Sequence, residues 1–400
     1  MFEKRIKTHH SAMAEGKKYA LGPRPVSQYL TSPEQDRGNG TIYIHVPFCP
    51  KICSFCNMRR SLQDAEPDYH RYVVKEIENY AKLPYIQSQT FDAVYFGGGT
   101  PTMLSDEAFR EILQALFSNL SFTEDAEVTV ETTVTELTEE KITVLGENHV
   151  NRFSVGVQTF NDEERIRMNR VGSGEKAYQK LKYLKDQGKF TLSMDLIYNY
   201  AGQTLDDLRR DLESIQELEL DGFSMYSLID MKGSRIDLSQ DLRSDEMMFR
   251  EIAETMEAAG YSFLELTKMV KGDQYRYIMN RHRAADTLPL GAGAGGSVNH
   301  LMMMNEINLD KYRESVEHFD TRKGMLFRPE YDEITRFKGD IQTLFLPGNE
   351  TLYRDQQKYQ RYRQQLMDEG YVKFCNDKYK LTDKGVFWGN TISRELSDMI

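Results

Sequence analysis

The chain has 400 residues, which is enough for two or three domains of ordinary size. It carries 51 Lys and Arg against 62 Asp and Glu, a net charge of −11, which excludes a generally basic nucleic-acid binder, so no nucleic-acid partner is expected. No apolar run approaches the roughly 20 residues of a membrane span, and the first twenty residues lack the apolar core of a secretory signal. We therefore expect a cytoplasmic globular protein with no membrane partner.

The first forty residues are polar, and we expect them to form an extension with little structure of its own. From Thr41 onward, short runs rich in β-formers alternate with longer amphipathic stretches. Strands are predicted at 41–46, 92–96, 127–131, 152–157, 191–197, 222–228 and 261–266, and helices at 68–83, 106–120 and 204–218. This alternation predicts an α/β fold with six or seven βα units, a partial or near-complete barrel whose chemistry gathers at the C-terminal ends of the strands.

The alternation stops after about residue 285. A glycine-rich segment at 288–298 is followed by helical patterns at 334–346 and 354–370, and then by two short strands around a polar turn at 376–378. A helix followed by a two-stranded ribbon predicts a small winged-helix-like domain. We therefore divide the chain into an extension (1–40), a β/α barrel (41–285), and a glycine loop with a helical, winged-helix-like domain (286–400).

Three of the four cysteines lie close together, at Cys49, Cys53 and Cys56, directly after the first predicted strand. A disulfide framework would spread its cysteines along a small secreted chain, whereas clustered thiolates favour a metal or iron–sulfur site in a reducing compartment. Three ligands would leave one iron of a 4Fe–4S cluster open to a substrate or cofactor. A structural zinc site would need a fourth ligand, for which His45 and Cys375 are the alternatives.

The CxxxCxxC spacing resembles the signature of the radical S-adenosylmethionine (radical SAM) superfamily, in which the open iron binds the amino and carboxylate groups of S-adenosylmethionine. The segment FGGGTPT, after the second predicted strand, resembles the superfamily's contact to the methionyl amino group. The segments TIYIHVPFC, RFSVGVQTF with MNR beyond it, and MDLIYNYAGQT resemble the branch of the oxygen-independent coproporphyrinogen III oxidases. The resemblance covers residues 41–400, including a C-terminal helical domain.

The resemblance implies a 4Fe–4S cluster on the three clustered cysteines and a set of contacts to one or two molecules of S-adenosylmethionine. These contacts are Tyr43 and Phe55 beside the cluster, Gly98, Gly99 and Thr100 at the methionyl end, Glu131 at one cofactor, Gln158, Arg170 and Asp195 where a second can bind, Ser227 near an adenosine, and Gly295 in the late glycine loop. Several lie at or near the C-terminal ends of predicted strands, so a barrel would direct them to one mouth. Taken singly, each could be a capping or surface residue, and the sequence identifies no catalytic residue.

Three departures from the family pattern point to a subfamily. Met58 stands where the oxidases proper carry a fourth cysteine, and the loop from Tyr198 to Gln203 lacks the glycine–proline pair of the related heme chaperones. The late loop, Gly291 to Ser297, has glycine where the family has histidine. Together these features resemble the heme-utilisation branch, the anaerobic heme-degrading methyltransferases known as anaerobilin synthases.

That resemblance implies that heme is the substrate and that a radical derived from S-adenosylmethionine attacks a meso carbon. The macrocycle then opens to a linear methylated tetrapyrrole and releases iron without oxygen. It also implies an electron donor such as a flavodoxin or a flavin reductase. Candidate heme contacts are Met302, Met303 and Met304 for the ring, Arg281, His282 and Arg283 for the propionates, and His9 and His10 for the iron. Each set could instead be ordinary core, a solvated turn or a solvated tail.

Three alternative functions stay open at this point. The protein could be a heme chaperone that carries heme without breaking it, or an oxygen-independent coproporphyrinogen III oxidase. It could also be a winged-helix regulator that uses the cluster as a redox sensor, for which the helical stretch at 354–365 offers four basic side chains.

Overall fold

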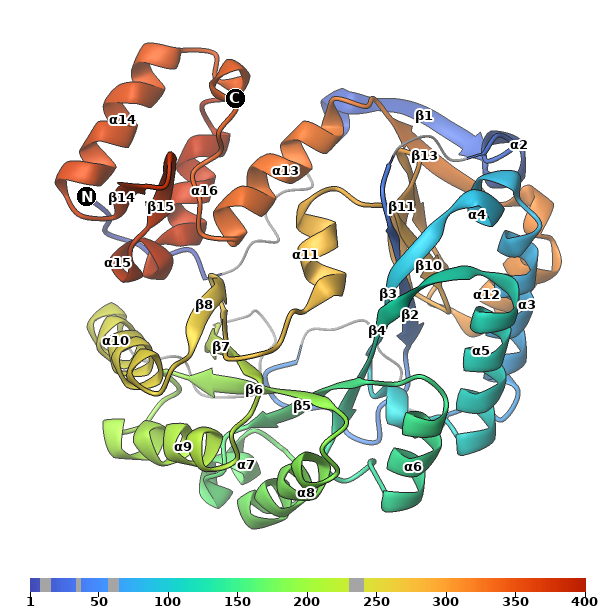
Figure 1. Ribbon diagram of the computed structural model, residues 1–400, viewed down its shortest axis with the longest axis horizontal. Coiled ribbons are helices and arrows are strands. Elements are labelled where there is room, and N and C mark those ends of the chain that lie inside the picture. The colour runs from blue at the N-terminus through green and yellow to red at the C-terminus, as the bar shows by residue number, and fades with distance from the viewer. Residues whose placement is uncertain (8–15, 34–36, 57–64, 230–240) are drawn as a thin grey trace.

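A single curved sheet organises the molecule. The computed structural model describes residues 1–7, 16–33, 37–56, 65–229 and 241–400. Figure 1 shows the sheet bending around a central space, with most helices on its outer side. Its 13 strands run in the order β1-β13-β12-β11-β10-β2-β3-β4-β5-β6-β7-β9-β8. Within the described residues the end strands β1 and β8 do not pair, so the barrel is open.

Seven neighbouring strands are parallel and form the central part of the sheet. They are β10 (Thr287–Leu290), β2 (Gly40–Val46), β3 (Thr90–Gly98), β4 (Ser121–Thr133), β5 (Arg152–Gln158), β6 (Thr191–Tyr198) and β7 (Gly222–Ser227). The outer helices are α3 (Tyr69–Ala81), α4 (Pro84–Ser88), α5 (Asp106–Asn119), α6 (Glu139–Glu147), α7 (Asp162–Arg167), α8 (Gly174–Asp186), α9 (Leu205–Glu217), α10 (Leu242–Ala258) and α12 (Leu309–Glu317). The predicted α/β class and open barrel are confirmed.

Alternation along each strand separates the core from the functional interior. In β6, Leu192, Met194 and Leu196 are buried in the hydrophobic core between the sheet and its outer helices. Asp195, between them, lines the central cavity. Because successive side chains of a strand point to opposite faces, polar residues here lie inside the barrel without interrupting the core.

Two predictions made for the edges of the sheet are wrong. The stretch 261–266 is not a further parallel unit, because β8 (Ser262–Glu265) turns back directly into β9 (Lys268–Val270), which pairs antiparallel with both β8 and β7. The N-terminal region is also more structured than expected. Strand β1 (Ala20–Pro25) pairs antiparallel with β13 (Lys323–Phe327) and leads into α2 (Val26–Tyr29). Local composition could not reveal a partner strand so far away in the sequence.

The glycine-rich segment extends the main sheet. Strand β10 pairs in parallel with β2 and continues through a turn into β11 (Gly295–Val298) and β12 (Leu301–Met304), and β13, which follows α12, pairs with β12. Gly291 and Gly293 in that turn both have a φ of 86°, a conformation that favours glycine. A Cβ on Gly291 would also lie 2.4 Å from the His45 carbonyl oxygen. The domain boundary at 285 stays a prediction, although the sheet runs across it.

Helices dominate the C-terminal region, which lies beside the open part of the barrel (Figure 1). It contains α13 (Tyr331–Gln342), α14 (Gln356–Asp368), α15 (Asp383–Phe387) and α16 (Gly389–Ser397), while α11 (Arg276–His282) lies between α13 and the sheet. The predicted hairpin is confirmed as β14 (Val372–Cys375) and β15 (Lys378–Leu381), joined at Asn376 and Asp377, which both have positive φ. None of the described helices is long and apolar enough to cross a membrane.

Candidate functional site

A cavity of about 590 Å³ opens at the C-terminal ends of the parallel strands. We call it the cysteine cavity, because Cys49, Cys53 and Cys56 line it. All the predicted site residues except Tyr43 and Gly295 line it as well: Phe55, Gly98, Gly99, Thr100, Glu131, Gln158, Arg170, Asp195 and Ser227. The structure thus brings together side chains that lie up to 178 positions apart in the sequence, from Cys49 to Ser227.

The loop that carries the cysteines is held by the segment that follows α7. Asn169 Nδ2 donates to the Ile52 carbonyl oxygen at 2.7 Å, and the Ser54 backbone N–H donates to the Met168 carbonyl at 3.0 Å. Arg170 donates to Cys53 Sγ at 3.2 Å. The MNR sequence noted above therefore fixes the loop that supplies the thiols and places a guanidinium beside one of them.

The glycine turn after β3 packs directly on the chain that leads into Cys49. The backbone N–H groups of Gly99 and Thr100 donate to the carbonyls of Val46 and Phe48 at 2.8 and 2.7 Å. A Cβ on Gly99 would lie 2.4 Å from the Phe48 oxygen, and Gly98 has a φ of 113° with the His45 ring against it. Only glycine allows this close approach, so the turn and the cysteine loop form one unit.

Two partly buried carboxyl groups face the cysteine cavity from β4 and β6. Glu131 accepts hydrogen bonds from the Tyr95 hydroxyl at 2.6 Å and from the Gly98 N–H at 3.2 Å. Burial raises the pKa of Glu131 to about 7, against the lowering effect of these donors. Burial also raises the pKa of Asp195, against the lowering effect of Lys268. A cation bound beside either carboxyl group would favour its ionised form.

Several polar atoms in the wall of the cysteine cavity have no hydrogen-bond partner among the described residues. They are Gln158 Oε1, Arg170 Nε and Ser227 Oγ, all buried. Gln158 also has a φ of 71°, and the β5–β6 register shifts between Gly156 and Gln158. Buried polar atoms without partners are costly, and strained backbone gathers at functional sites, so both observations favour a polar ligand here.

The donor set fits the cofactors that the sequence predicted. Three thiols share one cavity with two carboxyl groups suited to a cationic ligand, and with free donors and acceptors for a ribose and a base. Within the described residues no group of three or more His, Cys, Asp or Glu side chains converges on a single metal ion. A cluster binds its cysteines through different irons, so convergence on one point is not required.

Some predicted residues lie elsewhere. Tyr43 does not line the cysteine cavity; its hydroxyl pairs with His45 Nδ1 at 2.9 Å and its ring stacks on Tyr277. Gly295 lines a second cavity, described below. Met58, His9 and His10 lie outside the described residues. The roles assigned to all these residues stay predictions.

The sequence did not reveal every residue that lines the cysteine cavity. Lys7 reaches it from the N-terminal segment, where its Nζ donates to the Leu228 carbonyl at 2.8 Å and lies 3.5 Å from Asp245. Ser154, Tyr226 and Thr267 also line it. The alternation of strands β5 and β7 could have indicated Ser154 and Tyr226, but no local signal places Lys7 here.

Comparison with known proteins shows what the whole chain is similar to. A model of the radical SAM superfamily matches residues 43–215. The chain is 28% identical over 375 residues to the anaerobilin synthase of Escherichia coli O157:H7, covering 90% of this chain and 84% of that protein. It is 27% identical over 374 residues to the heme chaperone HemW of Lactococcus lactis, covering 88% and 95%. The solved coproporphyrinogen III oxidase (HemN) of Escherichia coli matches 90% of both chains, with a TM-score of 0.73 and 22% identity.

The fold, the cysteine motif and these matches identify the chain as a radical SAM enzyme. Within that superfamily it is similar to the HemN-like proteins, namely coproporphyrinogen III oxidase, the heme chaperone and anaerobilin synthase. The family implies a 4Fe–4S cluster and bound S-adenosylmethionine, and the predicted resemblance is confirmed at this level.

Proposed function

We propose that the protein opens heme to a linear methylated tetrapyrrole and releases its iron, in the manner of an anaerobilin synthase. The proposal is supported by the likeness to that enzyme along nearly the whole chain. It is also supported by the sequence departures at Met58 and in the loop from Gly291 to Ser297, which separate the chain from the oxidases. The observation that carries the radical chemistry is the cysteine cavity, where three thiols and unpartnered polar atoms meet.

Different residues of the cysteine cavity would bind the cluster and the cofactor. Cys49, Cys53 and Cys56 would hold the cluster, which, when reduced, supplies the electron that cleaves S-adenosylmethionine. The turn at Gly98 and Gly99, which lines the cavity beside the cysteine loop, would contact the methionyl end. Glu131 and Asp195 would neutralise positive charge on the cofactor.

Further residues would hold the rest of the ligand. Gln158, Ser227 and Arg170 would satisfy the polar groups of one cofactor, or of a second one bound beside it. Because Arg170 also contacts Cys53, it joins the cluster loop to the cofactor pocket. That heme is the substrate, that one or two cofactor molecules bind, and that a separate protein donates the electron are parts of the same proposal.

The chaperone is the second candidate, since HemW relatives match the chain about as well as anaerobilin synthase does. One anaerobic experiment separates the two. The purified protein is reconstituted with iron and sulfide, reduced, and mixed with S-adenosylmethionine and heme. We expect loss of the heme Soret band together with a methylated open-chain tetrapyrrole, detected by mass spectrometry.

Other results would support one of the alternative functions or refute the radical mechanism. Intact heme that co-purifies with the protein on gel filtration would support the chaperone. Decarboxylation of added coproporphyrinogen III would support the oxidase. If no 5′-deoxyadenosine forms with any substrate, and Cys53→Ala behaves like the unchanged protein, the radical mechanism itself is refuted.

A further inference from the structure

A second cavity, of about 470 Å³, lies between strands β10–β12 and helices α11, α13 and α16. We call it the arginine cavity, after Arg281 in its wall. It shares no lining residue with the cysteine cavity. Figure 1 shows α11 and α13 next to the sheet where the barrel is open. Its volume falls within the range of small-molecule sites, about 300–1,000 Å³.

The charged groups that line the arginine cavity are mostly basic. They comprise four cations and two carboxylates: Arg37, Arg281, Lys338, Arg394, Asp286 and Asp332. This excess gathers positive charge in one cavity of a chain whose net charge is −11. Such a cavity attracts an anionic ligand, since a low-dielectric wall strengthens the field inside it.

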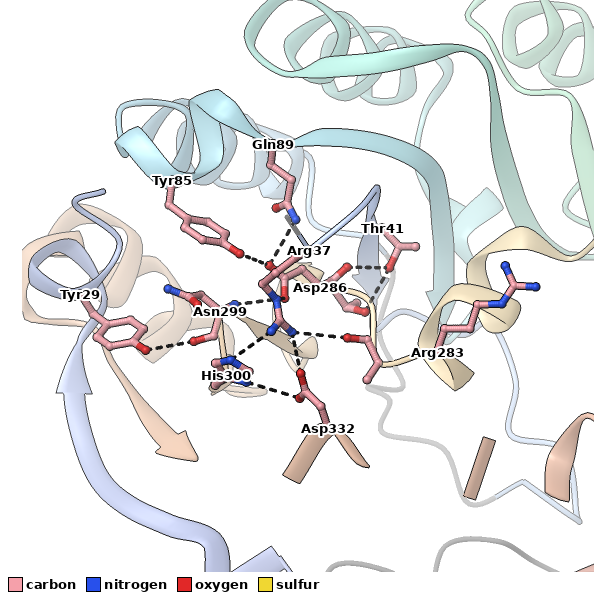
Figure 2. A network of polar contacts seen from close by, with 12 residues as sticks. Tyr29, Arg37, Thr41, Tyr85, Gln89, Arg283, Asp286, Asn299, His300 and Asp332 are labelled. Carbon is pink, nitrogen blue, oxygen red and sulfur yellow. Dashed lines mark hydrogen bonds and ion pairs between the residues drawn. The ribbon is translucent and has the colours of Figure 1, made fainter. Parts of the chain in front are cut away.

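Both carboxylates of the arginine cavity are already engaged, as Figure 2 shows. Asp286 accepts from Arg37 Nε at 2.9 Å, from the Tyr85 hydroxyl at 2.6 Å and from Gln89 at 3.2 Å. Asp332 pairs with another nitrogen of Arg37 at 3.1 Å and with His300 Nδ1 at 3.4 Å. Neither is left to neutralise Arg281.

Arg281 has no ion pair among the residues that the structure describes. The one hydrogen bond that its side chain makes to these residues goes to the Tyr277 hydroxyl at 3.2 Å, and its guanidinium lies 5.5 Å from the centre of that ring. A guanidinium has five N–H donors in a planar fork suited to a carboxylate. Most of that fork is available to a ligand in the cavity.

Part of the lining of the arginine cavity is apolar. Its side chains include Ile278, Met302, Met304, Phe327 and Ile334. Two glycines shape the space: a Cβ on Gly295 would lie 2.9 Å from Met304 Cε, and one on Gly339 would lie 2.1 Å from the His282 carbonyl oxygen. Methionine side chains adapt readily to flat apolar ligands. The combination of a guanidinium and this wall suits a carboxylate carried on a large apolar body.

Three tyrosines separate the arginine cavity from the cysteine cavity. Tyr277 bonds Arg281 on one side and stacks on Tyr95 at 4.6 Å and on Tyr43 at 5.9 Å on the other. Tyr95 in turn donates to Glu131, which lines the cysteine cavity. A ligand in the arginine cavity is therefore held apart from the cluster.

We propose that the arginine cavity is a second, non-catalytic site that binds the carboxylate side chains of a tetrapyrrole, with Arg281 as the anion contact and Met302 and Met304 against the ring. The choice of a tetrapyrrole rests on the proposed function, whereas the requirement for a carboxylate on an apolar body rests on the lining residues alone. The site holds substrate or product away from the reacting position.

The test compares iron-free protoporphyrin IX with its dimethyl ester, which lacks only the two acidic groups. Trp388, the one tryptophan of the chain, lies at the start of α16 and reports binding through quenching of its fluorescence. We expect the acid to bind the unchanged protein roughly tenfold more tightly than the ester, or better, because a charge-assisted hydrogen bond is lost in the ester.

Variants locate the binding. Arg281→Gln should weaken binding of the acid to the level of the ester, or lower the stoichiometry by one if the cysteine cavity also takes a porphyrin. Arg283→Gln is the matched control, since Arg283 is exposed and does not line the cavity. Thr335→Phe, which fills the cavity from α13, should weaken binding of both ligands.

Two results overturn the site: equal affinity of acid and ester for the unchanged protein, or an Arg281→Gln variant that binds the acid as well as Arg283→Gln does. The first needs no variant and so does not depend on the folding of one. If porphyrin binding depends on Arg281 but heme is not consumed, the second site is supported and the proposed function is refuted. If heme is consumed but porphyrin binding does not depend on Arg281, the proposed function is supported and the second site is refuted.

Discussion

The two cavities of this protein differ in the charge that they present. Two partly buried carboxyl groups, Glu131 and Asp195, face the cysteine cavity, and desolvation raises the pKa of each. The arginine cavity presents Arg281, whose partner is a tyrosine. The tyrosine stack between them keeps these two carboxyl groups apart from Arg281 within one open barrel. The contrast indicates that Glu131 and Asp195 suit the cationic part of a ligand, whereas Arg281 suits an anionic one.

The largest effect should come from removing a thiol of the cysteine cavity. Cys53→Ala should lower 5′-deoxyadenosine formation at least about 100-fold, because the cluster loses one of its three ligands. Cys375→Ala, in the C-terminal ribbon, is the matched control and should keep full activity. Porphyrin binding in the arginine cavity should be the same in both variants. A parallel loss of that binding would show that the two cavities are not independent.

Charge in the cysteine cavity should govern cofactor affinity through Glu131. With a pKa of about 7, the carboxyl group is half ionised near neutral pH, and a cationic cofactor favours its ionised form. Affinity for S-adenosylmethionine should therefore rise between pH 6 and pH 8, and calorimetry should record proton release on binding. Glu131→Gln should bind about tenfold more weakly at pH 8 and show no such pH dependence.

The same substitution should have the opposite effect on the stability of the cofactor-free protein. Burial raises the pKa of Glu131 from 4.5 to about 7, so the folded state retains a proton that the unfolded chain releases. This contribution to stability is present below pH 4.5 and is lost as pH rises through 7. Glu131→Gln should thus melt at a higher temperature than the unchanged protein at pH 8. Glu127→Gln, on the same strand but outside the cavity, should show neither effect.

Sequence reasoning found the cysteine cavity more readily than the arginine cavity for a physical reason. The thiol spacing and the glycine turn are local patterns, and the C-terminal ends of parallel strands must meet, so Cys49, Gly98 and Asp195 could be placed together in advance. The arginine cavity depends on antiparallel pairing of β11 with β10 and β12 and on packing of α11 against α13, which no short pattern encodes. Lys7 was missed for the same reason.

A smaller effect is expected from loosening the loop that carries the cysteines. Asn169→Ala removes the bond to the Ile52 carbonyl and places alanine at a φ of 56°. Asn169→Gly removes the bond but tolerates that backbone, so the pair separates hydrogen bonding from strain. Both variants should lose iron to a chelator several-fold faster, because the lost hydrogen bond stabilises the loop by about 1 kcal/mol or more. If only the alanine variant did so, backbone strain and not the bond would be responsible.

The smallest effect should come from adjusting the charge of the arginine cavity without touching Arg281. Asp332 holds Arg37 and His300, and its pKa lies below the ordinary value because their attraction outweighs its burial. Asp332→Asn keeps the shape but removes one negative charge from the lining, so Arg37 can turn more of its fork to the ligand. Protoporphyrin IX should then bind roughly twofold more tightly, as expected for a partly exposed ion pair worth about 0.5 kcal/mol. Glu333→Gln removes the same charge from an exposed neighbouring position on α13 and should change affinity less. Equal gains in both variants would mean that net charge, and not the lining of the cavity, attracts the porphyrin.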